Sequence, residues 1–148
     1  MAARNDGVEK CVVGAIVHRA GAVLLLTRSM NDAFMPGIEE LPSGGVEVGE
    51  TLNEALDREL LEEVGFPAGI VEPGFLAQFD YLSGSGRLTR QFTVSVPLND
   101  QASVALSDEH SSYRWIECTE IDASSATSET QGVVAAWFGW DTSTGPHL

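Results

Sequence analysis

The stretch "GGVEVGETLNEALDRELLEEVGF", residues 44–66, decides the fold because it contains a glycine-rich loop, a helix and both ends of that helix. Thr51 with Glu54 three residues later is typical of a capping box, and Gly65 followed by Pro67 predicts the helix end. Between these ends, apolar residues recur at helical spacing and are expected to pack on a sheet. They are Leu52, Leu56, Leu60 and Val64.

The same helix carries three glutamates on one face. At about 100° per residue, Glu59, Glu62 and Glu63 fall within an arc of roughly 100°. Like charges at this spacing destabilise a helix unless a cation lies among them. Hard carboxylate oxygens suit Mg²⁺ or Mn²⁺, which also keep open positions for phosphate and water. A solvated acidic face is the alternative for this triplet alone, but the flanking residues favour a cation site.

Those flanking residues add flexible backbone and further charge. Ser43–Gly45 and Gly49 allow the backbone to bend closely around a ligand and to present carbonyls to it. Glu50 begins the helix, where it either gains from the helix dipole or reaches the metal cluster; both interpretations remain open. Arg58 is expected to point away from the centre of the acidic arc, either orienting a carboxylate with its fork of donors or forming an ordinary salt bridge.

Together these residues resemble the Nudix box, G-x5-E-x7-R-E-U-x-E-E-x-G-U, in which U is a bulky aliphatic or aromatic residue. Every specified position is filled, over about a sixth of the chain, by Gly44, Glu50, Arg58, Glu59, Leu60, Glu62, Glu63, Gly65 and Phe66. The resemblance implies a metal-dependent pyrophosphohydrolase that cleaves a nucleoside diphosphate linked to another moiety, with Mg²⁺ or Mn²⁺ as cofactor.

The resemblance also implies roles for individual residues. Glu59, Glu62 and Glu63 would hold the metal, with a backbone carbonyl of Ser43 or Gly44 as a further ligand. Glu59 would take the proton from water, although this assignment stays open. Family members often carry another glutamate just before the last core strand. Here that position is Glu109, as ligand or general base, with Asp108 and His110 as alternatives.

The remaining elements predict an α+β fold, an α/β/α sandwich with a mixed central sheet, in one domain over 1–148. Strands are expected at 11–18 and 22–28, joined as a hairpin by Arg19–Gly21, and at 70–82 and 87–98 around a second turn. A short strand at 113–117 and an amphipathic helix at 128–140 complete the order. Residues 31–45 are expected to form an irregular loop.

The composition and net charge of the chain limit the classes of molecule that it is expected to bind. The chain of 148 residues has a net charge of −14, which argues against nucleic acids and anionic membranes as partners because both select clusters of Lys and Arg. No apolar run is long enough to span a membrane and no signal peptide is recognisable, so we expect a cytoplasmic protein. Cys11 and Cys118 are interpreted as two buried, reduced thiols. A homodimer is possible, as in other family members.

A small anionic substrate needs local cations. Arg28 is the first candidate for a phosphate contact, followed by Arg90, with Arg87 and Arg114 as further candidates. Phe34 and Tyr81 are candidates for stacking on a base, as are Phe79 and Phe92, although aromatic residues on strands are more often part of a core.

The family's markers downstream of the box bear on the substrate. Tyr81 stands 15 residues beyond Phe66, and no proline occurs between 74 and 96, which argues against ADP-ribose and NADH. Nucleoside triphosphates or modified nucleotides are therefore the expected substrates. The alternatives are dinucleoside polyphosphates, nucleotide sugars or ADP-ribose, or, in another class, a regulatory domain that binds nucleotides without turnover.

Overall fold

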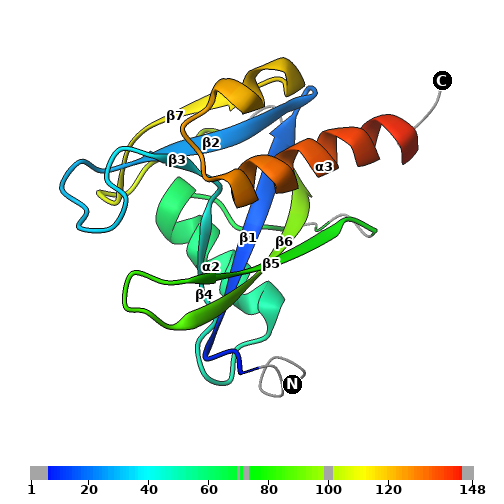
Figure 1. The fold of residues 1–148 in the computed structure, drawn as a ribbon. Coiled ribbons are helices and arrows are strands. Elements are labelled where there is room, and N and C mark those ends of the chain that lie inside the picture. Colours follow the sequence, from blue (N-terminus) through cyan, green and yellow to red (C-terminus); the bar gives the residue numbers. More distant parts are fainter. Residues whose placement is uncertain (1–6, 70, 72–73, 99–101, 145–148) are drawn as a thin grey trace.

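The computed structural model describes residues 7–69, 71, 74–98 and 102–144, and Figure 1 shows their arrangement. The strands are β1 (Lys10–Arg19), β2 (Ala22–Arg28), β3 (Glu39–Glu40), β4 (Ser43–Gly45), β5 (Leu76–Leu82), β6 (Leu88–Pro97) and β7 (His110–Ile116). The helices are α2 (Leu52–Val64), the 3₁₀ helix η1 (Cys118–Ala123) and α3 (Ser128–Thr144).

The first two strands form a hairpin that opens away from its turn. Ala20 and Gly21 both have positive φ, 53° and 81°, which matches the twist that a tight hairpin needs. β1 and β2 are paired next to this turn, at His18↔Val23 and Arg19↔Ala22. Farther from the turn, β4 pairs with β1 and β3 pairs with β2. The two short strands therefore lie where the hairpin strands diverge.

The sheet is mixed, as predicted. β6 runs parallel to β1 from Lys10↔Thr89 to His18↔Pro97, while β5 pairs antiparallel with β6 and β7 pairs antiparallel with β2. Both predicted strand pairs are confirmed.

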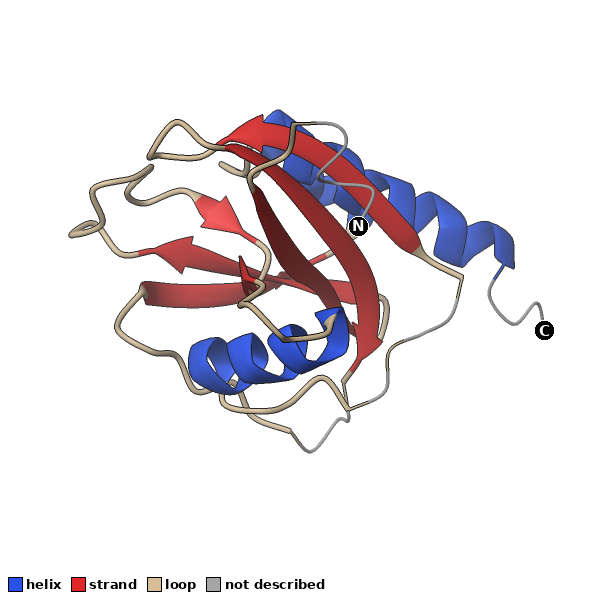
Figure 2. Ribbon diagram, turned by 90° about the horizontal axis from the view of Figure 1, so that it is seen from below, coloured by secondary structure: helices blue, strands red, loops and turns tan. Residues whose placement is uncertain are grey.

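Alternation along β1 and β2 divides the core between the two faces of the sheet. Val13, Val17 and Leu24 pack against α2, whereas Ile16 and Leu25 belong to the second cluster with α3. Figure 2 shows α2 and α3 on opposite sides of the strands. Val133, Val134 and Trp137 of α3 are buried, as its helical spacing predicts. The α/β/α sandwich is confirmed.

Several local predictions need correction. Residues 31–45 are not wholly irregular, because they contain β3 and β4, whose pairing depends on strands distant in the sequence. Leu52 is 38% exposed, since it lies at the first turn of α2 beyond the edge of the packed face. The last strand begins at His110, and the 3₁₀ helix η1 was not predicted.

The start of β5 and the exposure of the two cysteines also differ from the predictions. β5 begins at Leu76, and residues 70, 72 and 73 of the predicted strand lie outside the described residues.

Both cysteines are free, but Cys118 is exposed and Cys11 only half-buried, so they are not two buried thiols. Within the described residues, no helix combines the length and apolar character needed to cross a membrane.

Candidate active site

The helix α2 is fixed at both ends, which sets the direction of its acidic residues. Glu54 N–H donates to Thr51 Oγ1 over 3.1 Å, and Thr51 N–H donates to the Glu54 carboxylate over 2.8 Å. At the other end Gly65 has φ 86° and closes the helix in the left-handed conformation. Leu56 and Leu60 are buried against the sheet. The intervening acidic face is thereby directed toward β4.

Glu63 is the most buried of the three glutamates, with 4% of its surface exposed. Its Oε1 accepts a hydrogen bond from the Ser43 backbone N–H over 2.8 Å. Burial raises the pKa of Glu63 to about 9, because the charged form loses its hydration and this single hydrogen bond offsets only part of the loss. A positive charge placed beside this carboxyl would favour its ionised form.

Glu59 lies directly against the glycine turn. A Cβ atom at Gly44 would overlap the Glu59 carboxylate, so only glycine allows the backbone and this side chain to approach as they do. Burial raises the pKa of Glu59, and its hydrogen bond from Arg58 opposes that rise. Glu62 differs from both, because its side chain is 60% exposed.

Arg58 links the parts of this turn. Its Nη1 donates to Glu59 Oε1 over 2.6 Å, and its Nη2 donates to the Gly45 carbonyl over 2.9 Å. Nε and Nη2 each donate to one oxygen of Glu50 over 2.8 Å. These hydrogen bonds lower the pKa of Glu50 to about 2, helped by the Glu47 N–H. The predicted fork of Arg58 is therefore present, and Glu50 lies in an ion pair with it.

Glu59, Glu63 and the turn at 43–45 border a cavity of about 270 Å³, which we call the acidic cavity. A carboxylate oxygen of Glu63, one of Glu109 and a ring nitrogen of His110 lie within 4.8 Å of one another. Such a set offers ligands to a divalent cation. The acidic cavity is lined by Arg28, Asp32, Glu40, Ser43, Gly44, Gly45, Glu59, Glu63, Glu109 and His110.

His110 and Glu40 add a buried pair to this wall. The His110 side chain is 2% exposed, and its Nε2 lies 2.8 Å from Glu40 Oε2. Since a carboxylate accepts, Nε2 carries the donated hydrogen, and Nδ1 has no hydrogen-bond partner among the described residues. Sequence reasoning named His110 as an alternative to Glu109 for the functional group. Its pairing with Arg28 across β7 and β2 could not be read from the sequence.

Arg28 stands at the acidic cavity, but its charge is already engaged. Its guanidinium donates to both oxygens of Glu40 over 3.1 and 3.2 Å and to Asp32 over 2.5 Å. It also donates to the Phe34 carbonyl over 3.0 Å and lies 5.6 Å from the centre of the Phe34 ring. Arg28 therefore holds the 29–38 loop against β3.

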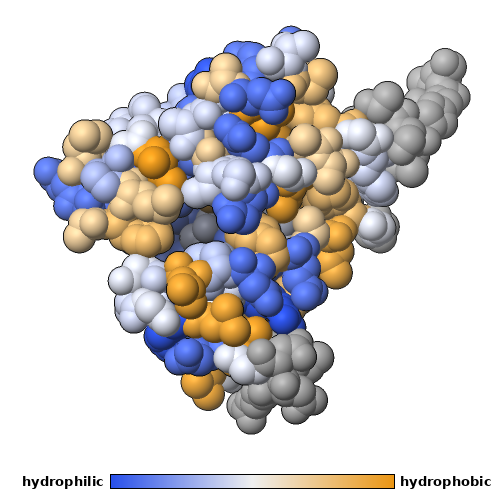
Figure 3. Space-filling model, in the orientation of Figure 1, coloured by the Kyte–Doolittle hydropathy of each residue, from blue (hydrophilic) through white to orange (hydrophobic). Residues whose placement is uncertain are grey.

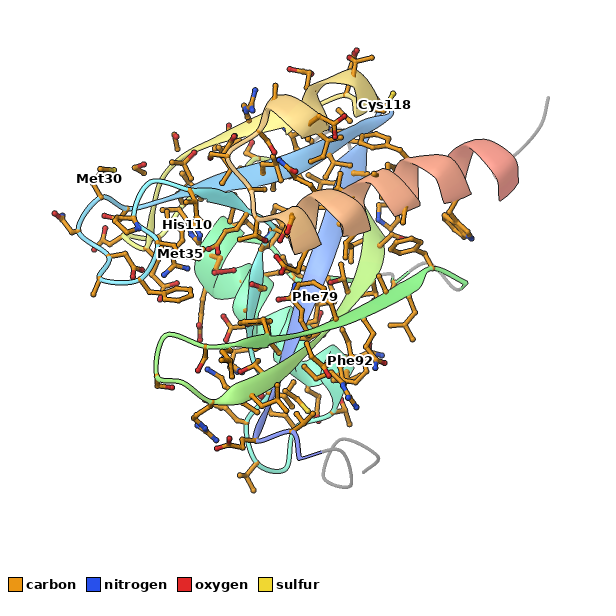
Figure 4. All side chains as sticks on the ribbon, viewed as in Figure 1. Met30, Met35, Phe79, Phe92, His110 and Cys118 are labelled. Atoms are coloured by element: carbon orange, nitrogen blue, oxygen red, sulfur yellow. The ribbon has the colours of Figure 1, made fainter. Side chains whose placement is uncertain are left out.

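A second cavity of about 540 Å³ adjoins the first. Its walls include Phe34, Phe79 and Tyr81, and we call it the aromatic cavity. Phe34 packs on the β5–β6 turn so tightly that a Cβ at Gly84 would lie 2.7 Å from its ring. Figure 3 shows the surface hollowed between the 29–38 loop and this turn, and Figure 4 labels Phe79 on β5. The two cavities share Arg28, Glu40, Ser43, Gly44 and Gly45.

Some predicted substrate contacts lie elsewhere. Arg90 forms an ion pair with Asp80, through hydrogen bonds of 2.8 and 3.0 Å, and lines neither cavity. Arg87 and Phe92 also lie outside the residues that line them. Arg114 is paired with Glu39. Conversely, Lys10 and Gln91 line the aromatic cavity and were missed, because their strands meet only in the folded sheet.

Comparison with known proteins agrees with this geometry. The family model described as NUDIX domain matches residues 9–138. Nucleoside triphosphatase NudI from Enterobacter sp. (strain 638) is 40% identical over 57 residues, which are 38% of this chain and 40% of that protein. The matched part thus spans less than half of the curated relative.

Solved structures extend the likeness over most of the chain. The MutT protein from Methanosarcina mazei Go1 is 25% identical with a TM-score of 0.76, covering 93% of this chain and 97% of that one. An Ap4A hydrolase from C. elegans has a TM-score of 0.78 at 20% identity, covering 91% and 99%, and so shows a shared fold. With the family model matched from β1 to α3 and with Gly44, Glu59 and Glu63 of the Nudix box lining one cavity, this chain belongs to the Nudix family of hydrolases.

Proposed function

We propose that this chain, acting as one domain over residues 1–148, is a metal-dependent pyrophosphohydrolase of nucleoside triphosphates or modified nucleotides. The observation that carries the proposal is the junction of the two cavities. A carboxylate-lined cavity suited to a cation and a diphosphate opens, across Ser43–Gly45, into a larger cavity with aromatic walls. One molecule that has both a polyphosphate and a planar base would occupy both.

The residues of the acidic cavity fit Mg²⁺ or Mn²⁺. Glu63 is a buried carboxyl held by one backbone hydrogen bond, and a carboxyl in that position is stabilised as an anion only by a nearby positive charge. Glu59, Glu63 and Glu109 would hold the cation, together with a carbonyl of Ser43 or Gly44, and Glu62 from the exposed edge. When bound, the cation would neutralise the diphosphate and acidify a coordinated water.

The side chains around it have distinct tasks in this proposal. Arg58 fixes Glu59 and the Gly45 carbonyl in place through short hydrogen bonds, so that the carboxylate does not have to be reorganised during reaction. Glu50 keeps Arg58 oriented, rather than contacting the reacting atoms. Glu59 or Glu109 accepts the proton of the attacking water. Arg28 maintains the wall that both cavities share.

The aromatic cavity would receive the nucleoside. Phe34 and Tyr81 line it from different elements, and a base stacked on such rings gains about 1–3 kcal/mol per base. The name of the NudI relatives supports a nucleoside triphosphate as the substrate. Dinucleoside polyphosphates, nucleotide sugars and ADP-ribose are the alternatives within the family.

A substrate panel tests this function. Nucleoside triphosphates, a dinucleoside tetraphosphate, a nucleotide sugar and ADP-ribose would each be incubated with the protein and Mg²⁺ or Mn²⁺, while release of pyrophosphate and phosphate is measured. We expect pyrophosphate from at least one triphosphate, and no release when EDTA is added. Tight nucleotide binding without any release would instead identify a regulatory binding domain.

A further inference from the structure

The aromatic cavity contains several charged groups, and most of them already have partners. Glu39 accepts two hydrogen bonds from Arg114, over 2.6 and 3.0 Å, and others from Ser125. Glu40 accepts from Arg28 and His110. These carboxylates have little remaining capacity to accept a hydrogen bond from a ligand.

Lys10 is different. It is the only lysine of the chain and stands at the start of β1, where it lines the aromatic cavity. Its Cε lies 3.3 Å, and its Nζ 3.9 Å, from the position that a Cβ of Gly45 would take, so the ammonium lies beside the strand that separates the two cavities. Among the contacts of the described residues, Lys10 has neither an ion pair nor a side-chain hydrogen bond.

The other polar groups near Lys10 do not share its one-sided chemistry. Gln91 on β6 pairs with Val12, which follows Lys10 by two residues on β1. The Nε2 of Gln91 donates to Thr93 over 3.3 Å. A carboxamide both donates and accepts, and hydroxyl groups do the same, so they adapt to either kind of base edge. An ammonium group has three donors and no acceptor. Arg28 also has donors alone, but Glu40 and Asp32 engage it, so among the described residues that line this cavity Lys10 is the cation left for a base edge.

We propose that Lys10 selects nucleotides whose base has a carbonyl oxygen at C6 of a purine or C4 of a pyrimidine, as guanine, uracil and thymine do, against adenine and cytosine, which have an amino group at that position. Within the proposed function, on which this inference rests, the Lys10 ammonium donates to that carbonyl from the wall of the aromatic cavity at the start of β1. An exocyclic amino group at the same place would face the ammonium with its own donors and leave both unpaired, which costs binding.

Glu129 provides the rival arrangement. It lines the same cavity from the first turn of α3 and is exposed, with a single 3.3 Å hydrogen bond from Ser128. If Glu129 were the group that contacts the base edge, amino-bearing bases would be preferred. A contact from Lys10 and a contact from Glu129 thus predict opposite preferences among the bases.

The experiment compares matched bases. The ratio of kcat/KM would be measured for GTP over ATP and for UTP over CTP, in the unaltered chain, Lys10→Met, Glu129→Gln and, as a control outside both cavities, Arg87→Met. We expect both ratios to exceed about ten in the unaltered chain and to fall by about tenfold in Lys10→Met, mainly through KM. Glu129→Gln and Arg87→Met should retain them.

Unchanged ratios in Lys10→Met would overturn the proposal. So would a preference for ATP and CTP that disappears in Glu129→Gln.

Binding separates this inference from the proposed function. Calorimetric titration with GMP and with AMP needs no turnover, and the unaltered chain should bind GMP more tightly by about tenfold, a difference that Lys10→Met removes. If no triphosphate is hydrolysed but this difference is found, the proposed function fails and the role of Lys10 stands. If hydrolysis occurs and the difference is missing, the role of Lys10 fails alone. If neither monophosphate binds, the role of Lys10 fails, and the proposed function fails with it only when no triphosphate is hydrolysed.

Discussion

The two adjoining cavities are built in opposite ways. The acidic cavity takes half of its lining from one continuous stretch, since Ser43, Gly44, Gly45, Glu59 and Glu63 lie within 43–63. The aromatic cavity combines β1, the 29–38 loop, the β5–β6 hairpin and the first turn of α3. Residues fixed by one helix and one turn can be predicted from their spacing, whereas a cavity between distant elements depends on the packing of the whole chain. Substitutions in the acidic cavity should therefore change the rate of hydrolysis, whereas substitutions in the aromatic cavity should change affinity and the preference among bases.

Glu63→Gln should have the largest effect on the acidic cavity. The amide keeps the shape and can still accept from Ser43 N–H, but it lacks the charge that would hold a cation. We expect turnover to fall by more than ~100-fold, beyond the loss typical of residues that only support a metal ligand. Rates with Mg²⁺ and binding of Mn²⁺ would be measured together.

The matched control for Glu63→Gln is Glu120→Gln on η1, whose exposed carboxylate lines neither cavity. Near-normal turnover and Mn²⁺ binding by Glu63→Gln would show that this carboxylate is not a ligand.

Gly44→Ala tests the close approach of backbone and carboxylate. Because the added methyl group would overlap Glu59, that side chain must move, and a displacement of about 1 Å can cost ~100-fold in rate. Turnover should fall with little change in melting temperature. Gly132→Ala is the control, since nothing lies within 4 Å of its added atom. Equal rates for both variants would contradict the tight fit of Glu59.

Arg58→Lys tests whether the fork of donors matters beyond its charge. Lysine has three donors on one nitrogen and cannot replace the four hydrogen bonds that three nitrogens of Arg58 donate, so we expect turnover to fall by ~10–100-fold, with a smaller change in KM. Steady-state kinetics would measure both constants. If Arg58→Lys were as active as the unaltered chain, the role of Arg58 would be only that of a charge in an ordinary ion pair.

In the aromatic cavity, Tyr81→Leu should change affinity more than chemistry. Loss of a stacking ring costs about 1–3 kcal/mol per base, so we expect KM to rise by roughly tenfold or more while kcat stays nearly constant. Phe92→Leu, outside the residues lining either cavity, is the control. A fall in kcat at constant KM in Tyr81→Leu would mean that the two cavities do not divide their tasks as described.

The smallest effect concerns stability and pH. The folded pKa of Glu63, about 9, lies above its ordinary value of 4.5, so the folded chain binds the extra proton between these values. In EDTA, its contribution to stability is complete below pH 4.5 and is lost as the pH rises toward 9. We expect the melting temperature to fall steadily across pH 6–9, by ~2–4 °C for each kcal/mol of stability lost in a chain of this size.

Glu63→Gln supplies the comparison for that measurement, because it carries no titrating proton at this site. Its melting temperature should decline less across pH 6–9 than that of the unaltered chain. Parallel curves for the two proteins would show that Glu63 ionises normally.

The comparison of cavities also explains which predictions succeeded. The capping box at Thr51 and the stop at Gly65 are local hydrogen-bonding and backbone preferences, so the limits of α2 followed from sequence. The strands β3 and β4 did not, because their few residues acquire partners only where β1 and β2 diverge. Arg28, the first candidate for a phosphate contact, does line the acidic cavity, but its engagement with Glu40 and Asp32 depends on side chains brought together by β3 and the 29–38 loop.

By itself, the sequence determined the helix with its one acidic face, the glycine turn before it and the membership of the Nudix family that these imply. Their spacing is enough because helix geometry converts residue number into direction. Only the tertiary structure decided that Glu63 is buried while Glu62 is exposed, that Glu50 pairs with Arg58, and that Lys10 lines a cavity. Burial, hydrogen-bond partners and cavities are set by atoms from distant segments, and no local spacing encodes them.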